Sequence, residues 1–145
     1  MIFADSSAVV KIYSEEPGSA EMRTLPLLVV SAICRVEVTS AIWKKATHGD
    51  LEEIEAQQLI RDFQADLRSV RPEATDLIAI PVTNVLLRSA AALVPIHNLK
   101  ALDAIQLSSA LAAREADTSC DTFACYDRTL ARAAASHGFR IYSPS

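Results

Sequence analysis

The stretch Ile2-Phe3-Ala4-Asp5-Ser6-Ser7-Ala8-Val9-Val10-Lys11-Ile12-Tyr13 decides the fold class of this 145-residue chain. Its first residues form a short apolar run typical of a buried strand, and residues 6–13 follow with a helical pattern. The strand passes into the helix through a single acid, Asp5. The stretch therefore predicts the first β–α unit of an α/β fold, with Asp5 at the strand's carboxyl end, the edge where open α/β sheets bind ligands.

The rest of the chain repeats this alternation of short apolar runs and longer helical patterns. It predicts one α/β domain over residues 1–145 with a parallel sheet. Ser31 is the expected N-cap of one helix, and Asp50 with Glu53 is the expected capping box of the next. We expect further strands over 27–30, 77–82, 122–125 and 140–142, and further helices over 20–24, 31–47, 51–69, 84–93, 102–116 and 128–137.

Composition excludes several classes of chemistry. The chain has only three glycines, at positions 18, 49 and 138, so it contains no glycine-rich dinucleotide or P-loop motif and no G-x-S-x-G nucleophile elbow. No apolar run approaches the ~18 residues of a membrane span, and no signal peptide is evident. Without glycine-rich motifs, any catalysis must rest on side chains. The three cysteines form no metal-type pair and suit a reducing compartment, so we expect a cytoplasmic protein.

The net charge of −4 is unevenly distributed along the chain. Residues 50–66 hold six acids and only Arg61 as a base, a local net charge of −5. When that segment and the four acids discussed next are set aside, eight acids face thirteen bases, a net of +5. The composition is therefore compatible with a basic surface around an acidic pocket, as a nucleic-acid enzyme requires.

Four acids stand where a solvated helix face explains them poorly: Asp5, Glu37, Asp103 and Asp127. Asp5 and Asp127 follow predicted strands, Glu37 lies in a largely apolar stripe, and Asp103 lies in the first turn of its helix. Each has a structural alternative, namely a helix cap for Asp5 and Asp127, a first-turn acid for Asp103, and a paired acid for Glu37.

Taken together, the four acids favour a shared site, because all four can converge on one crevice of a doubly wound sheet. Crowded carboxylates raise one another's pKa unless a cation compensates them. Mg²⁺ prefers oxygen ligands and uses few carboxylates together with substrate phosphates. Such a site supplies hydroxide near neutral pH and stabilises a phosphodiester for in-line displacement.

The opening stretch resembles the first motif of PIN-domain proteins of the VapC toxin type. Residues 31–37, the segment Leu99-Lys100-Ala101-Leu102-Asp103-Ala104-Ile105-Gln106-Leu107, and the segment Tyr126-Asp127-Arg128-Thr129-Leu130 followed by residues 133–134 are similar to the later motifs. Each motif is weak alone, but the four occur in the right order over essentially the whole chain.

The resemblance implies a three-layer PIN-like fold, with a parallel sheet of about five strands flanked by helices, in a single nuclease domain. It also implies a Mg²⁺- or Mn²⁺-dependent endoribonuclease that forms a homodimer and is neutralised by a VapB-like antitoxin. By position, Asp5, Glu37, Asp103 and Asp127 match the family's catalytic acids, with Asp5, Asp103 and Asp127 as metal ligands. Ser6 matches the hydroxyl residue that supports the first acid.

Two positions depart from the family's pattern. Cys125 stands where the family usually has Thr, which puts a supporting hydrogen bond in doubt. Lys100 stands where Arg is common, and it keeps the charge without the fork geometry of Arg.

Two other functions are compatible with parts of the sequence. A haloacid-dehalogenase-like phosphatase also uses an acid after its first strand, but it needs a second Asp where this chain has Ser7. A catalytically inactive PIN-fold module that binds RNA or protein predicts the loss of one or more acids, and none is lost. Trp43 and Tyr13 could stack on bases, although packing in the core or a dimer fits their spacing better. The candidate phosphate contacts are Lys11, Arg35, Lys44, Lys45, Lys100 and Arg128.

Overall fold

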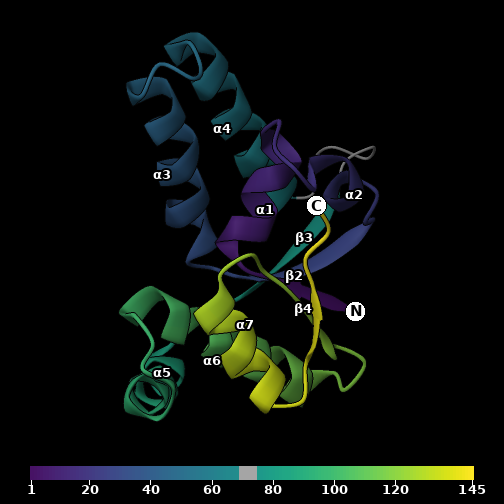
Figure 1. Ribbon diagram of the computed structural model, residues 1–145, viewed down its shortest axis with the longest axis vertical. Helices are drawn as coiled ribbons and strands as arrows, with labels where there is room; N and C mark the ends of the chain where they lie inside the picture. The colour runs from purple at the N-terminus through teal and green to yellow at the C-terminus, as the bar shows by residue number, and fades with distance from the viewer. Residues whose placement is uncertain (69–74) are drawn as a thin grey trace.

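The computed structural model describes residues 1–68 and 75–145 (Figure 1). Within these residues a sheet of five parallel strands has the order β3-β2-β1-β4-β5. The expectation of a parallel sheet of about five strands is confirmed. The strands are β1 (Ile2–Ala4), β2 (Leu27–Ser31), β3 (Asp76–Ile80), β4 (Thr122–Ala124) and β5 (Arg140–Tyr142).

Helices cover both faces of the sheet and give the predicted three layers. In the view of Figure 1, α1, α3 and α4 lie above the sheet, and α5, α6 and α7 lie below it. The helices are α1 (Ser6–Tyr13), α2 (Ser19–Arg23), α3 (Cys34–Thr47), α4 (Glu53–Leu67), α5 (Asn84–His97), α6 (Ala101–Ala116) and α7 (Arg128–Ser136).

The three central strands β1, β2 and β4 are largely buried on both sides because each face of the sheet packs on a helical layer. Phe3 joins Phe123 in the cluster that packs against α5, α6 and α7, with ring centroids 5.2 Å apart. Its neighbour Ala4 points the other way, into the cluster with Leu28 and residues of α1 and α3. This two-sided burial is what a parallel sheet between helices requires.

The strand order places a topological switch point between β1 and β4. From β1 the chain moves to β2 and β3 on one side, and then returns to place β4 on the other side of β1. The backbone N–H of Asp5 donates to the carbonyl of Ala124 at 3.0 Å, so the two strands end side by side. Open α/β sheets bind their ligands in the crevice at such a point.

Two predicted helix starts are wrong. Ser31 is not an N-cap, because it remains in β2, pairs with Ile80 and accepts a hydrogen bond from Ser109 Oγ at 2.9 Å. The helix α3 begins at Cys34 instead. The capping box of α4 is formed by Glu52 and Glu55, two residues after the predicted pair, because the chain is still turning at residues 48–51.

Other boundaries also differ from the sequence prediction. The helix α5, predicted over residues 84–93, continues through Pro95 to His97 and ends at Asn98, whose φ of 54° is left-handed. Proline lacks the N–H that helix interiors need, but this one lies in the last turn. The strand β3 ends at Ile80, immediately before a proline. The predicted end of the α4 helix at residue 69 lies outside the described residues.

No single helix in the described ranges has both the length and the apolar character to cross a membrane. Together α5 and α6 would meet those two criteria, but they are bent by 115° relative to each other. They also pack extensively on the rest of the fold, with Leu93 and Leu107 buried in the core.

Candidate functional site

The four predicted acids lie at the N-terminal ends of four helices. Asp5 is the N-cap of α1, and Asp127 is the N-cap of α7. Glu37 lies in the first turn of α3, and Asp103 lies in the first turn of α6. Because helix N-termini carry partial positive charge, all four carboxylates stand where the backbone favours an anion.

These acids are close enough to act on one another electrostatically. The charges of Asp103 and Glu37 act on Asp5, and those of Asp127 and Glu37 act on Asp103. Exposure rises from Asp5, which is 5% exposed, through the half-buried Glu37 and Asp103 to the exposed Asp127. The four carboxylates therefore form one acidic cluster that opens toward solvent at Asp127.

Asp5 caps α1 with one carboxylate oxygen. Its Oδ1 accepts hydrogen bonds from the backbone N–H of Ala8 at 3.0 Å and from Ser7 Oγ at 2.6 Å. Ser7 Oγ also accepts from the backbone N–H of Tyr126 at 3.2 Å, which ties the site to the segment after β4. The cap interpretation of Asp5 is confirmed, and it leaves the second oxygen for another role.

Burial raises the pKa of Asp5 from its ordinary value of 3.8 to about 7. The two hydrogen bonds lower this pKa, whereas the charges of Asp103 and Glu37 raise it further. Burial also raises the pKa of Asp103, and repulsion from Asp127 and Glu37 adds to that rise against the attraction of Lys100. The charges of these carboxylates are thus only partly compensated by the protein.

Glu37 is held by two side chains from other helices. Its Oε1 accepts hydrogen bonds from Ser6 Oγ at 2.9 Å and from Gln106 Nε2 at 2.8 Å. Ser6 was expected to support Asp5, but it contacts Glu37, and Ser7 supports Asp5 instead. The difference follows from helix geometry, because an N-cap side chain folds over the second and third residues of its helix.

Gln106 and Ser7 belong to the site but were not predicted from the sequence. Gln106 lies three residues after Asp103, on the same face of α6, between the apolar residues Ile105 and Leu107. A buried amide in such a stretch is unusual. The sequence therefore contains a signal for Gln106, namely a polar residue between two apolar ones on the helix face that carries Asp103. It contains no such signal for Ser7, because a serine two positions after Asp5 does not by itself indicate a contact.

Asp127 caps α7 at the open end of the cluster. Its Oδ1 accepts from the backbone N–H of Leu130 at 2.8 Å, and it lines an open pocket of about 230 Å³ with Cys125 and Arg128. Burial raises the pKa of the Cys125 thiol to about 12, so the thiol stays protonated. The thiol donates a weak hydrogen bond to the backbone carbonyl of Asp127 at 3.7 Å, which partly replaces the hydroxyl of the expected Thr.

The donor set fits a hard divalent cation that keeps part of its water shell. Among the described residues, the second oxygens of Asp5, Glu37 and Asp127 accept no hydrogen bond. As the side chains stand in the described ranges, no three acids, histidines or cysteines are close enough to bind one ion directly. Mg²⁺ typically uses one or two carboxylates and retains several waters, so this spacing suits it.

Two of the candidate phosphate contacts are engaged elsewhere. Lys11 is 8% exposed and pairs with Glu16 at 3.1 Å, so its assignment as a phosphate contact is wrong. Lys45 pairs with the same acid at 2.7 Å, and the two lysines hold the pKa of Glu16 down at about 2. The core interpretation of Tyr13 is confirmed, since its ring is buried against Phe63.

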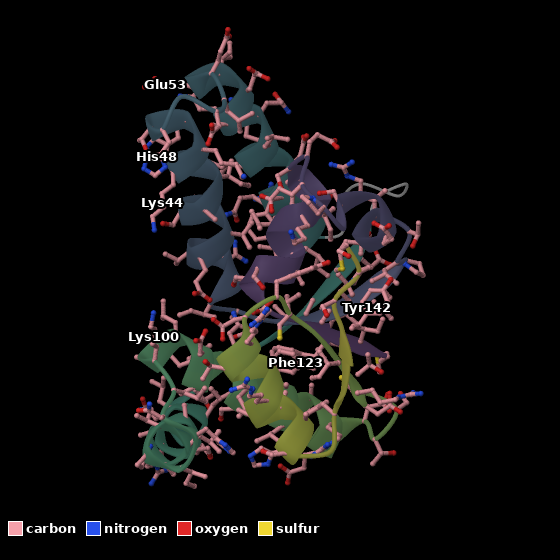
Figure 2. All side chains as sticks on the ribbon, in the orientation of Figure 1. Lys44, His48, Glu53, Lys100, Phe123 and Tyr142 are labelled. Atoms are coloured by element: carbon pink, nitrogen blue, oxygen red, sulfur yellow. The ribbon has the colours of Figure 1, made fainter. Side chains whose placement is uncertain are left out.

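The remaining bases are available on the surface. Arg35 donates to Gln64 at 2.8 Å, and Lys44 is exposed on α3. Figure 2 shows Lys44 and Lys100 on the same side of the molecule, with Glu53 at the far tip of the α3–α4 pair. The acidic segment that contains Glu53 is therefore directed away from Lys100, which precedes Asp103.

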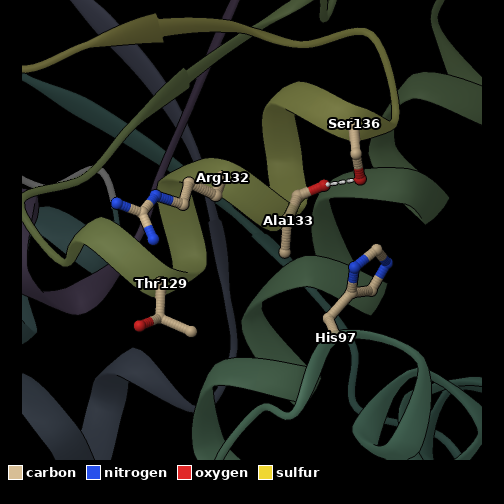
Figure 3. Close-up of a pocket in the computed structure, with 5 residues that line it drawn as sticks. All are labelled: His97, Thr129, Arg132, Ala133 and Ser136. Carbon is tan, nitrogen blue, oxygen red and sulfur yellow. Dashed lines mark hydrogen bonds between the residues drawn. The ribbon is translucent and has the colours of Figure 1, made fainter.

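A separate polar pocket of about 280 Å³ lies between α7 and the end of α5 (Figure 3). It is lined by His97, Thr129, Arg132, Ala133 and Ser136, and none of the four acids lines it. The Nε2 atoms of His97 and His137 lie 2.9 Å apart beside it. His97 and His137 thus pair with each other and stay outside the acidic cluster.

Comparisons with known proteins agree with the motif resemblance. No protein-family model matches the chain. Ribonuclease VapC45 of Mycobacterium tuberculosis strain CDC 1551 / Oshkosh and Ribonuclease VapC49 of strain ATCC 25618 / H37Rv are each 28% identical to it over 145 residues, 97% of this chain and 94% of the relative. These similarities confirm the resemblance to VapC-type proteins.

A solved structure supports the fold. The crystal structure of Mycobacterium tuberculosis VapC20, described as a Sarcin-Ricin loop cleaving toxin, superposes with a TM-score of 0.59 and 15% identity. The match covers 96% of this chain and 96% of that chain. The prediction of a PIN-like fold is confirmed.

The raised pKa of Asp5 predicts how stability depends on pH in metal-free protein. Between pH 5 and about 7 the folded state keeps a proton that the unfolded state has lost, so stability falls as pH rises, by at most about 1.4 kcal/mol per pH unit for this group. Asp5→Asn keeps a capping side chain and removes this titration, so its slope is shallower. Urea unfolding in chelator at several pH values measures both slopes, and a wild-type stability that rises over this range contradicts the prediction.

Asp103→Asn tests the repulsion within the acidic cluster at a second carboxylate. The substitution removes a carboxylate under repulsion, so the metal-free variant melts at or above the wild-type temperature. We expect Mg²⁺ at 100-fold its dissociation constant to stabilise wild type by about 2.7 kcal/mol, on the order of 5 to 10 °C, and to stabilise the variant much less. A first-turn acid that only favours the helix dipole predicts the opposite, a metal-free variant that melts lower.

Proposed function

We propose that this chain, a relative of the VapC ribonucleases, is a metal-dependent endoribonuclease that acts as the toxin of a toxin–antitoxin pair. The observation that carries the proposal is the convergence of four carboxylates at the switch point of a parallel sheet. Ribonuclease is the printed activity of both curated relatives, and the PIN-like fold agrees with it. Residues 1–145 form the single nuclease domain in this proposal.

Asp5, Asp103 and Asp127 are the proposed ligands of Mg²⁺, with Mn²⁺ as a substitute. In keeping with their spacing, one or two of them would bind the ion directly and the others through its waters. Their uncapped oxygens and their mutual repulsion favour a cation among them. A bound Mg²⁺ would supply a water of lowered pKa and would stabilise the charge that develops on the phosphodiester. Glu37, held by hydrogen bonds from two neighbours, would orient that water and accept its proton.

Bases around the mouth of the cluster position the RNA backbone. Lys100 is exposed and precedes Asp103, and Arg128 is exposed and follows Asp127. Each base thus brings positive charge beside an acid that holds the ion. Phosphates of the substrate can contact these bases while the scissile bond lies over the carboxylates.

The proposed setting is the cytoplasm, with a VapB-like antitoxin and a second copy of the chain as protein partners. Cys34, Cys120 and Cys125 are buried, free thiols, as in proteins of a reducing compartment. Apolar side chains are exposed on α5 and at the start of α6, including Val85, Leu87, Ile96 and Leu102. Such a surface suits a homodimer interface.

We expect the purified protein to cut RNA with Mg²⁺ or Mn²⁺ and to lose this activity in chelator. Glu37→Gln and Asp103→Asn each lower cleavage by about 100-fold or more, because each removes a charged group from the reacting site. Asp76→Asn is the matched control, since this exposed acid lies at the opposite end of the sheet. Gel assays on total RNA measure cleavage.

Two outcomes of the same experiment would favour the other functions. Hydrolysis of p-nitrophenyl phosphate without RNA cleavage would favour a phosphatase. RNA binding that is indifferent to chelator and never leads to cleavage would favour an inactive binding module.

The homodimer is tested with two equally exposed isoleucines. Ile96 on α5 and Ile54 on α4 are each 68% exposed. Ile96→Glu places a charge in the proposed interface, so the variant is monomeric by light scattering at micromolar concentration, whereas wild type and Ile54→Glu remain dimers. A monomeric wild type, or dissociation caused by Ile54→Glu alone, contradicts the assignment of this surface.

A further inference from the structure

Three polar atoms from three helices form a closed triangle beside the acidic cluster. Ser6 Oγ on α1 donates to Glu37 Oε1 on α3 at 2.9 Å. Gln106 Nε2 on α6 donates to the same Oε1 at 2.8 Å and to Ser6 Oγ at 2.9 Å. Gln106 is 2% exposed, so both of its N–H donors are committed inside the protein.

The charge on Glu37 fixes which way the amide of Gln106 points. A flipped amide would bring two acceptor oxygens, the amide oxygen and Glu37 Oε1, to hydrogen-bond distance, which is repulsive. The orientation with the NH₂ group toward Glu37 is therefore the favourable one. This orientation leaves the amide oxygen unsatisfied, since Gln106 Oε1 is buried and has no hydrogen-bond partner among the described residues.

A buried amide oxygen without a partner destabilises a protein, so packing alone gives no reason for glutamine at this position. A methionine of similar length would fill the same space without an unpaired oxygen. The two N–H donors are the feature that methionine lacks. The glutamine is thus explained by what it does to Glu37 and Ser6 rather than by its contribution to the core.

We propose that Gln106 is a positioning residue that fixes the Glu37 carboxylate within the metal-binding cluster. With Oε1 held by Ser6 and Gln106, Oε2 is the oxygen left to act on the ion or its water. Gln106 and Asp103 lie three residues apart on one rigid helix, so the same contact also fixes the distance between Glu37 and Asp103. This inference rests on the proposed function for its metal, but the contact itself exists in the metal-free protein.

The first test uses binding of Mn²⁺ alone, measured by calorimetry on four proteins: wild type, Gln106→Met, Glu37→Gln and the double variant. Gln106→Met weakens Mn²⁺ binding by about 10-fold or more, because a misplaced Glu37 no longer holds a water of the ion, and loss of such an outer partner typically costs about 10- to 100-fold in affinity. In the Glu37→Gln background the same substitution has little further effect, because the group it positions has lost its charge. Gln57→Met, at an exposed position of α4, is the matched control and binds Mn²⁺ like wild type.

Thermal melting separates positioning from a structural role. Gln106→Met removes both the donors and the unpaired oxygen, so the metal-free variant melts within a few degrees of wild type. A variant that unfolds, wild-type Mn²⁺ affinity in Gln106→Met, or full additivity with Glu37→Gln would each overturn the inference.

The second test needs no variant at position 106. In the NMR spectrum of the metal-free wild type, the side-chain NH₂ of Gln106 exchanges slowly with solvent and shifts on addition of Mg²⁺, and in Glu37→Gln its resonances move. A rapidly exchanging NH₂ that is insensitive to both changes overturns the inference. If wild type binds Mn²⁺ and shows this NMR pattern but does not cut RNA, the proposed nuclease function is refuted and the role of Gln106 stands. If wild type cuts RNA but the Gln106 resonances are insensitive to both changes, the role of Gln106 is refuted and the nuclease function stands.

Discussion

The parallel direction of the strands is the constraint on which the site depends. Because every strand runs the same way, every strand ends at one edge of the sheet, and each helix that follows a strand there begins at that edge. Glu37, Asp103 and Asp127 are carried to this edge by helices that belong to two different layers. The placement of β4 beside β1 then brings the segment that carries Asp127 to the end of β1 that carries Asp5, although 121 residues separate the two acids in the sequence.

The structure also removes a conflict between two interpretations of the same acids. A capping acid and a metal ligand were alternatives in the sequence, but a carboxylate has two oxygens and can serve in both ways. Asp5 and Asp127 each use Oδ1 to cap a helix, and each retains Oδ2. Because the capping hydrogen bond fixes each side chain to the start of a helix, the position of the free Oδ2 is fixed as well.

The fold was largely predictable because its signal is local. Apolar runs that end at Asp5 and just before Asp127 mark strand ends in the sequence itself. Pairing between distant segments was not predictable, and the extension of β2 to Ser31 depends on Ile80, about 50 residues away. The same limit applies to the site, where the acids could be found from the positions that they occupy, but the contact of Gln106 with Glu37 spans 69 residues and leaves no periodic trace.

The increase in exposure from Asp5 to Asp127 has a kinetic consequence. In the proposed metal site, an ion that reaches the buried end would pass the open carboxylate of Asp127 first, and Mg²⁺ gives up its waters reluctantly. In that site the outer acid would govern how quickly ions enter and leave, whereas the inner acids would govern how long a captured ion resides. Two enzymes with this arrangement can share one equilibrium affinity and differ widely in exchange rate, depending only on how open the position of Asp127 is.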